Sequence, residues 1–313
     1  MTKPAVLMTG SYPDWDLAEL ESSYRVLRLW EAADHDAFLA EHGSEVRAIA
    51  TRGDLGASAA LMQALPSLEI VACYGVGTDA IDLDHARVAG IRVTNTPDVL
   101  TDDVADLAVA LLLAAARQIP QGDTHVRAGR WPAGPLPLTT RVSGKAVGIV
   151  GMGRIGTAVA KRLAVFDADI AYFGRTPREA LPYAFVDDLV ALARRSEFLI
   201  LTLAASDATR GLIDARVIEA LGREGILVNV SRGSTVDELA LLAALESGTI
   251  KGAGLDVFWN EPVIDRRFAD LPNVVLAPHH ASGTVETRRA MGELVRNNLA
   301  AHFDGRPLVT PVV

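Results

Sequence analysis

The chain has 313 residues, about twice the ~150 residues of a common domain, which predicts two domains or one large one. Half of the residues are hydrophobic, 22% are charged and the formal net charge is −9, values typical of an acidic globular protein. This composition argues against disorder and against a basic nucleic-acid-binding surface, and the length excludes a peptide hormone. The single cysteine, Cys73, cannot form an internal disulfide, which fits a cytoplasmic location and a small buried side chain.

In the first hundred residues, short β-branched runs alternate with amphipathic stretches. Helices are expected over stretches such as residues 33–41 and 83–89. Strands are expected at residues 5–8, 26–29, 46–50, 69–73 and 91–94. Strict alternation of strand and helix predicts a parallel sheet whose crossover helices are right-handed.

A helix is expected from Thr101 to about residue 118, with Asp102 and Asp103 near the positive end of its dipole. Its most apolar part, residues 107–116, would be about 15 Å long, against a hydrocarbon core of about 30 Å. This segment therefore predicts a buried helix and no membrane span. Residues 127–137 are rich in proline and glycine and predict an extended loop.

A second alternating series follows, with strands expected at residues 146–150, 169–173, 198–203, 226–230, 253–257 and 274–277. The last helical pattern, residues 285–303, lies far enough along the chain to return to the first unit. We therefore expect an α/β protein with two Rossmann-like, doubly wound parallel-sheet domains and a cleft between them. Residues 1–98 with 284–313 would form a discontinuous substrate (catalytic) domain, and residues 99–283 a dinucleotide-binding domain.

A glycine-rich turn follows the strand at 146–150 and leads into a helix expected over residues 157–166. In this G-x-G-x-x-G arrangement, Gly151 permits a tight turn, Gly153 lets the backbone approach a pyrophosphate, and Gly156 allows close packing of helix on strand. The free amides at the start of the helix would bind the anion. The alternative is a glycine turn that serves packing alone.

Residue 174 indicates which dinucleotide binds, because an NAD site places an acidic residue there to accept a hydrogen bond from the ribose 2′-hydroxyl. This chain has Gly174, Arg175 and Thr176 instead. A guanidinium and a hydroxyl suit a 2′-phosphate, so the sequence favours NADPH over NADH. Arg154 and Arg178 are further candidates for phosphate contacts. The alternative is an Arg175 side chain that is merely solvated.

Three polar residues fall just past expected strand ends: Arg232, Glu261 and His279. An arginine can bind a carboxylate with two hydrogen bonds, a histidine can give a proton to a carbonyl oxygen, and a nearby carboxylate favours the charged imidazole. These groups suit the reduction of a 2-oxo acid by hydride transfer. Each could instead be structural, and His280 lacks a Cys or His partner at metal-ligand spacing, so no metal is expected.

These motifs resemble those of the D-2-hydroxyacid dehydrogenases, in particular the glyoxylate/hydroxypyruvate and hydroxyphenylpyruvate reductases. The resemblance rests on segments spread over residues 74–284. They are residues 74–82 (YGVGTDAID), 99–107 (VLTDDVADL), 147–156 (VGIVGMGRIG), 229–233 (NVSRG), 252–258 (GAGLDVF) with Glu261 and Pro262, and 277–279 (APH).

The resemblance implies roles for the three polar residues. Arg232 would orient the substrate, His279 would donate the proton, and Glu261 would hold and polarise His279. The amides of Val76 and Gly77 would bind the substrate carboxylate. Leu55 and Leu100 are candidate pocket walls, with simple core residues as the alternative.

The resemblance also assigns the cofactor groove and the assembly. Arg154, Ile155, Leu203 and Ser231 would line the groove, and Asp256 would contact the nicotinamide carboxamide. A homodimer is implied, formed mainly through residues 98–141, which would also explain why 107–116 is so apolar. Trp131 lies in this region and could enter the partner's pocket.

The expected function is reduction of a small 2-oxo acid, such as glyoxylate or hydroxypyruvate, to the D-2-hydroxy acid with NADPH. Two alternatives stay open: a reductase of bulky aryl 2-oxo acids such as hydroxyphenylpyruvate, and a dinucleotide-sensing regulator of the same fold. A formate dehydrogenase is disfavoured, because those relatives carry glutamine where Glu261 stands. The residues after His279 also depart from the family pattern, with His280 and Ala281 in place of Gly-Ser.

Overall fold

A computed structural model describes residues 3–313, which form two compact units. The described residues up to Leu100 and the segment Ser282–Val313 make the first unit, and Thr101–Ala281 make the second. Each unit contains one fully parallel sheet, of five strands in the first and seven in the second. The expected fold class, an α/β protein with two parallel-sheet domains, is confirmed.

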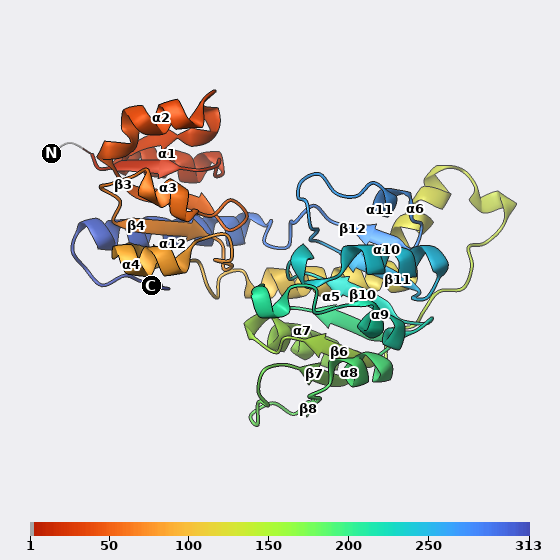
Figure 1. The fold of residues 1–313 in the computed structure, drawn as a ribbon. Helices are drawn as coiled ribbons and strands as arrows, with labels where there is room; N and C mark the ends of the chain where they lie inside the picture. The colour runs from red at the N-terminus through yellow and green to blue at the C-terminus, as the bar shows by residue number, and fades with distance from the viewer. Residues whose placement is uncertain (1–2) are drawn as a thin grey trace. The chain divides into compact units, whose positions relative to one another are not determined.

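The first unit has the strand order β2-β1-β3-β4-β5 (Figure 1). Its strands are β1 (Ala5–Met8), β2 (Arg25–Arg28), β3 (Val46–Arg52), β4 (Ile70–Tyr74) and β5 (Arg92–Thr94), and its helices are α1 (Asp14–Ser23), α2 (His35–His42), α3 (Ala59–Gln63), α4 (Leu83–Ala89) and α12 (Val285–Phe303). β4 is buried along its whole length, which includes Cys73, as predicted for that residue. A strand buried on both faces requires helices on both sides of the sheet.

The C-terminal helix α12 is held in this unit by a buried ion pair. Asp16 of α1 is 1% exposed and lies 2.5 Å from Nη1 of Arg296 on α12. The hydroxyl of Tyr74, at the end of β4, donates to Asp16 (3.2 Å) and to the carbonyl of Arg288 (2.7 Å). A Cβ at Gly292 would lie 1.9 Å from Asp16 Oδ1, so only glycine permits this approach of α12 to α1.

Replacing Asp16 with alanine is expected to lower the free energy of unfolding by about 2 to 4 kcal/mol, because it leaves Arg296 without its carboxylate partner. Urea denaturation measures this loss. As a matched control, Asp304→Ala removes an exposed pair with Arg306, whose loss should cost about 1 kcal/mol or less. Equal losses for the two variants would contradict a structural role for the buried pair.

The second unit has the strand order β12-β11-β10-β9-β6-β7-β8. Its strands are β6 (Ala146–Val150), β7 (Asp169–Phe173), β8 (Ala184–Phe185), β9 (Phe198–Leu201), β10 (Ile226–Asn229), β11 (Gly252–Leu255) and β12 (Val274–Leu276), and its helices are α5 (Thr101–Arg117), α6 (Ile119–Arg127), α7 (Arg154–Ala164), α8 (Leu189–Arg195), α9 (Ala215–Leu221), α10 (Glu238–Ser247) and α11 (Arg267–Asp270). The order reverses at β6, whose neighbours β7 and β9 follow it in the chain. Such a switch point is where doubly wound sheets bind ligands.

The structure corrects the sequence interpretation of the region from 107 to 137. The apolar face of α5 packs on α7, β10 and β11 of its own unit, so a subunit interface is not needed to explain it. A Cβ at Gly254 of β11 would lie 3.0 Å from Leu111 Cβ, so the helix packs tightly on the strand at this glycine. Residues 119–127 form the unpredicted helix α6, and the expected loop contains a short 3₁₀ turn at Trp131–Ala133. None of the helices described for residues 3–313 is both long and apolar enough to span a membrane.

Candidate active site

Loops that follow parallel strands meet at one edge of the sheet in the second unit. Because every pair in this sheet is parallel, the loops after β10, β11 and β12 leave from the same edge. These loops carry Arg232, Glu261 and His279, respectively. Topology therefore places all three predicted residues at one edge.

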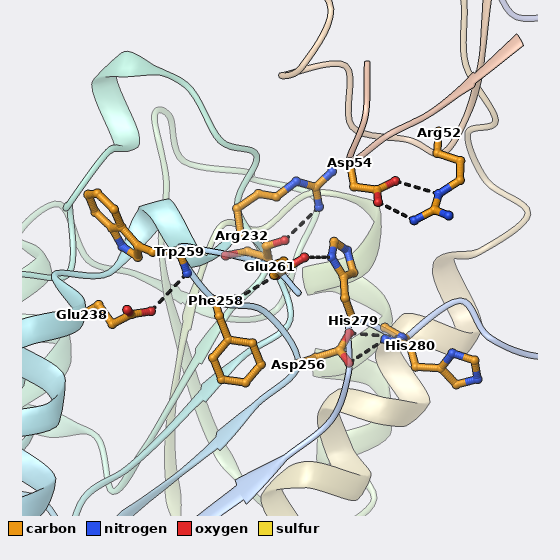
Figure 2. Close-up of polar contacts among 12 residues, drawn as sticks. Arg52, Asp54, Arg232, Glu238, Asp256, Phe258, Trp259, Glu261, His279 and His280 are labelled. Atoms are coloured by element: carbon orange, nitrogen blue, oxygen red, sulfur yellow. Dashed lines mark hydrogen bonds and ion pairs between the residues drawn. The ribbon is translucent and has the colours of Figure 1, made fainter. Parts of the chain in front are cut away.

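His279 and Glu261 are in direct contact at this edge (Figure 2). Nδ1 of His279 lies 2.5 Å from Oε2 of Glu261, and Oε1 of Glu261 accepts a hydrogen bond from the backbone N–H of Phe258 at 2.8 Å. An ionised carboxylate can only accept, so Nδ1 carries a proton in this pair and Nε2 is left for chemistry. The His279 side chain is 34% exposed and that of Glu261 is 26% exposed, so both are reachable from solvent.

The backbone of His279 is held in the left-handed region, with φ of 50°. Such a conformation is uncommon for residues other than glycine and must be stabilised by its surroundings. The N–H of His279 donates to the carbonyl of Asp256 (2.8 Å), and the Asp256 carboxylate accepts from the N–H groups of His280 (2.8 Å) and Ala281 (3.1 Å). Asp256 therefore fixes the turn that presents His279.

Asp256 is fully buried, and this burial raises the pKa of its carboxyl, although the two backbone N–H donors act in the opposite direction. Both of its oxygens are engaged within the chain. Its contact with a nicotinamide carboxamide, inferred from the resemblance, stays a prediction.

Arg232 lies three residues past the end of β10 at Asn229. Its Nη1 donates to the carbonyl of Ser231 at 2.9 Å, and the carbonyl of Arg232 accepts from Nδ2 of Asn229 at 3.1 Å. Ser231, predicted to line the cofactor groove, is 6% exposed, and its hydroxyl donates to Oδ1 of Asn229 at 2.7 Å. These contacts hold the backbone around Arg232 while its side chain is only half-buried.

The glycine-rich turn has the geometry that its spacing predicts. Gly151 has φ of 97°, and a Cβ there would lie 2.7 Å from the backbone of Leu203. A Cβ at Gly156 would lie 2.1 Å from the carbonyl oxygen of Gly151, whereas a Cβ at Gly153 would meet nothing within 4 Å. Gly153 therefore faces open space just before α7, whose first residue is Arg154. The helix begins three residues earlier than expected, which brings Ile155 and Gly156 into its first turn.

The turn after β7 folds back toward this glycine-rich turn. Arg175 and Thr176 are exposed and Gly174 is half-buried. The N–H of Arg178 donates to the hydroxyl of Tyr172 (2.6 Å), and its Nη1 donates to the carbonyl of Met152 (2.5 Å). A guanidinium therefore lies against the glycine-rich turn. This residue was a minor candidate in the sequence, because nothing in the local pattern predicts its contact with Met152.

In the first unit, Val76 and Gly77 follow β4 at the carboxyl edge of the sheet. Their carbonyls are held, because Val76 O accepts from Asn95 (2.9 Å) and Gly77 O accepts from the thiol of Cys73 (3.5 Å). Leu55 is 47% exposed, so the alternative that it is a core residue is wrong. Leu100 is 6% exposed and is a core residue.

A charged pair that the sequence interpretation missed lies at the same edge of the first unit. Arg52, the last residue of β3, donates to both carboxylate oxygens of Asp54, at 3.0 and 2.5 Å (Figure 2). Gly53, between them, donates to the carbonyl of Tyr74 at 3.4 Å, next to the Val76 loop. The position of Arg52 at the end of a parallel strand was the available signal.

The residues of the second unit suit a dinucleotide. The open face at Gly153, followed at once by the start of α7, is what a pyrophosphate requires. Within residues 3–313, no group of three or more His, Cys, Asp or Glu side chains could hold a metal ion.

The fold and this edge define a dinucleotide-dependent α/β enzyme, and comparison with known proteins identifies the family. The model of the D-isomer specific 2-hydroxyacid dehydrogenase NAD-binding domain matches residues 109–281. The chain belongs to the D-isomer specific 2-hydroxyacid dehydrogenase family. It is therefore an enzyme of this class, and its cofactor is a nicotinamide dinucleotide.

Similar proteins cover all or nearly all of the chain. Glyoxylate/hydroxypyruvate reductase A of Arabidopsis thaliana is 48% identical over 313 residues, which are 100% of both chains. Hydroxyphenylpyruvate reductase of Plectranthus scutellarioides is 48% identical over 295 residues, 94% of each chain. The structure of an NADPH-dependent glyoxylate/hydroxypyruvate reductase from Sinorhizobium meliloti with NADP and malonate has a TM-score of 0.94 and 45% identity, and the match covers 100% of this chain and 97% of that one.

Proposed function

We propose that the protein reduces small 2-oxo acids, such as glyoxylate and hydroxypyruvate, to D-2-hydroxy acids with NADPH. The observation that carries this proposal is the contact between His279 and Glu261, at the same sheet edge as Arg232. The similarity to glyoxylate/hydroxypyruvate reductases supports the substrate class. In this proposal the first unit binds substrate and the second binds the dinucleotide, in line with the family match over residues 109–281.

The proposed mechanism gives each of these residues a defined role. Arg232 binds the substrate carboxylate and stabilises the negative charge that develops on the carbonyl oxygen. Nε2 of His279 donates a proton to that oxygen, while Glu261 holds the protonated imidazole through Nδ1. The amides of Val76 and Gly77 bind the carboxylate from the first unit. The bound dinucleotide supplies the hydride.

NADPH is the proposed cofactor because the turn after β7 has no carboxylate at residue 174 and has two guanidinium groups, on Arg175 and Arg178. The resemblance adds Arg154, Ile155, Leu203 and Ser231 to the groove, and it gives Asp256 a contact with the nicotinamide carboxamide. The NADP bound to the Sinorhizobium meliloti relative supports this choice.

We also propose a homodimer, in a cytoplasmic setting. Four large hydrophobic side chains are about half or more exposed within residues 119–138: Ile119, Val126, Trp131 and Leu138. Such a group on one segment is typical of an interface. With Trp131 66% exposed, its entry into a partner's pocket stays part of this proposal.

A substrate panel separates the two enzyme candidates. With NADPH, kcat/KM for glyoxylate and hydroxypyruvate is expected to exceed that for 4-hydroxyphenylpyruvate by about tenfold or more, which corresponds to ~1.4 kcal/mol of transition-state binding. Oxidation of NADPH followed at 340 nm measures this ratio. A reversed ratio would favour the aryl 2-oxo acid reductase, a candidate that the hydroxyphenylpyruvate reductase relative supports.

A dinucleotide-sensing regulator is the candidate from another class. It would bind NADPH without turning over any 2-oxo acid. The complete set of Arg232, Glu261 and His279, with the last two in contact, argues against it, because a sensor has no need of a positioned proton donor.

A further inference from the structure

The loop that carries Glu261 starts from a buried part of the chain, because Val257 and Phe258 are 3% and 7% exposed. Residues 259–263 are all exposed after β11 ends at Leu255. Trp259, the largest of them, is 45% exposed, so its ring is only partly packed. Glu261 stays at hydrogen-bond distance from His279, and polar contacts of the exposed residues add to the packing of Phe258 in holding the loop.

Two hydrogen bonds of Trp259 provide such polar contacts, and Figure 2 shows the one to Glu238. Its backbone N–H donates to Oε2 of Glu238 at 3.0 Å, and its indole Nε1–H donates to the carbonyl of Val236 at 2.7 Å. We call Glu238, Trp259 and the Val236 carbonyl the brace. Glu238 is the first residue of α10, so its carboxylate is attached to a regular element of the unit.

The brace connects the segment that follows Arg232 to the segment that precedes Glu261. The two segments also approach closely at Gly233. A Cβ there would lie 2.0 Å from the carbonyl carbon of Phe258, so only glycine permits this contact. The N–H of Phe258 in turn donates to Oε1 of Glu261 at 2.8 Å. Both sides of the Glu261 carboxylate are thus restrained, one by Phe258 and the other by His279.

We propose that Glu238 and Trp259 are positioning residues. They keep the Glu261 carboxylate within hydrogen-bond distance of His279, so that the imidazole is oriented to donate its Nε2 proton to the substrate. The inference rests on the proposed reductase function. Neither residue contacts the reacting atoms in this proposal, and both act only through Glu261. A displacement of about 1 Å at a catalytic group can cost about 100-fold in rate, so the brace matters for turnover.

The test uses Glu238→Ala, which removes the acceptor for the Trp259 N–H, and Trp259→Phe, which removes the indole donor and keeps a ring. Each is expected to lower kcat about tenfold or more and to leave KM and the Kd for NADPH nearly unchanged. Glu238→Gln keeps an acceptor oxygen and should restore most of the rate. Leu239→Ala, at an exposed neighbouring position, is the matched control.

A double-mutant cycle with Glu261→Gln decides whether the brace acts through Glu261. In the Glu261→Gln background, Glu238→Ala should cause almost no further loss of kcat. If the two substitutions lower kcat independently, or if Glu238→Ala also weakens NADPH binding, the effect is a general one on the fold. Either result would overturn the inference. Unchanged kinetics in both single variants of an active enzyme would overturn the brace alone. A wild-type protein that reduces no 2-oxo acid would overturn the proposed function and this inference together.

Discussion

Replacing His279 with glutamine is expected to lower kcat by about 100- to 10,000-fold, the range that loss of a general acid produces. Glutamine keeps a polar side chain of similar reach but has no proton to give at neutral pH. Nδ1 of His279 is bound to Glu261 at 2.5 Å, so Nε2 is the nitrogen whose loss matters. Single-turnover measurement of NADPH oxidation in the variant and the wild type gives the ratio.

Binding of NADPH should survive this substitution, because the glycine-rich turn lies after β6 and His279 lies after β12. Quenching of tryptophan fluorescence by NADPH measures this affinity. The matched control is His280→Gln, since His280 contributes its backbone N–H to the Asp256 contact and its side chain is exposed. Near-normal turnover by the His279 variant would remove the proton-donor role from the mechanism.

The double substitution Gly174→Asp with Arg175→Ala is expected to shift the kcat/KM ratio of NADPH to NADH by about 100-fold or more toward NADH. In the proposed NADPH site, it removes one charge-assisted hydrogen bond to the 2′-phosphate and adds a carboxylate that repels that group. The new side chain fits, because a Cβ at Gly174 would approach only the carbonyl of Thr176, at 4.0 Å.

Arg194→Ala, which removes an exposed arginine on α8, controls for the loss of one positive charge from the unit. It should leave the cofactor ratio unchanged. If the double variant also leaves the ratio unchanged, the 2′-phosphate is recognised elsewhere. Arg178→Ala would then test whether the guanidinium beside Met152 performs this role.

The local parts of the site could be read from the sequence because each depends on a short segment. A buried strand followed by G-x-G-x-x-G predicts a tight turn whatever lies around it, and Gly151 and Gly156 have the close contacts that this pattern requires. Likewise, the parallel arrangement follows from alternating strands and helices, and it brings residues after different strands to one edge. That rule was enough to group Arg232, Glu261 and His279.

Helix α6 shows where local patterns mislead. Pro120 and Gly122 indicate a break in the chain, yet proline is well tolerated in the first turn of a helix, where its missing N–H has no partner to lose. The apolar stretch of α5 is a second case. Hydrophobicity predicts that a face is buried, but it does not say whether the chain's own sheet or another subunit covers it.

The sequence by itself determined the α/β class, the glycine-rich turn and the residue types that meet at the edge of the second sheet, because these follow from periodicity and from spacing within a few residues. Only the tertiary structure decided how Glu261 is held, which residues stabilise the left-handed turn at His279, and how Arg296 of α12 meets Asp16. Glu238 and Trp259 are 21 residues apart, and Asp16 and Arg296 are 280 apart. Contacts over such separations depend on how the strands are ordered and how the helices pack, and no local pattern records them.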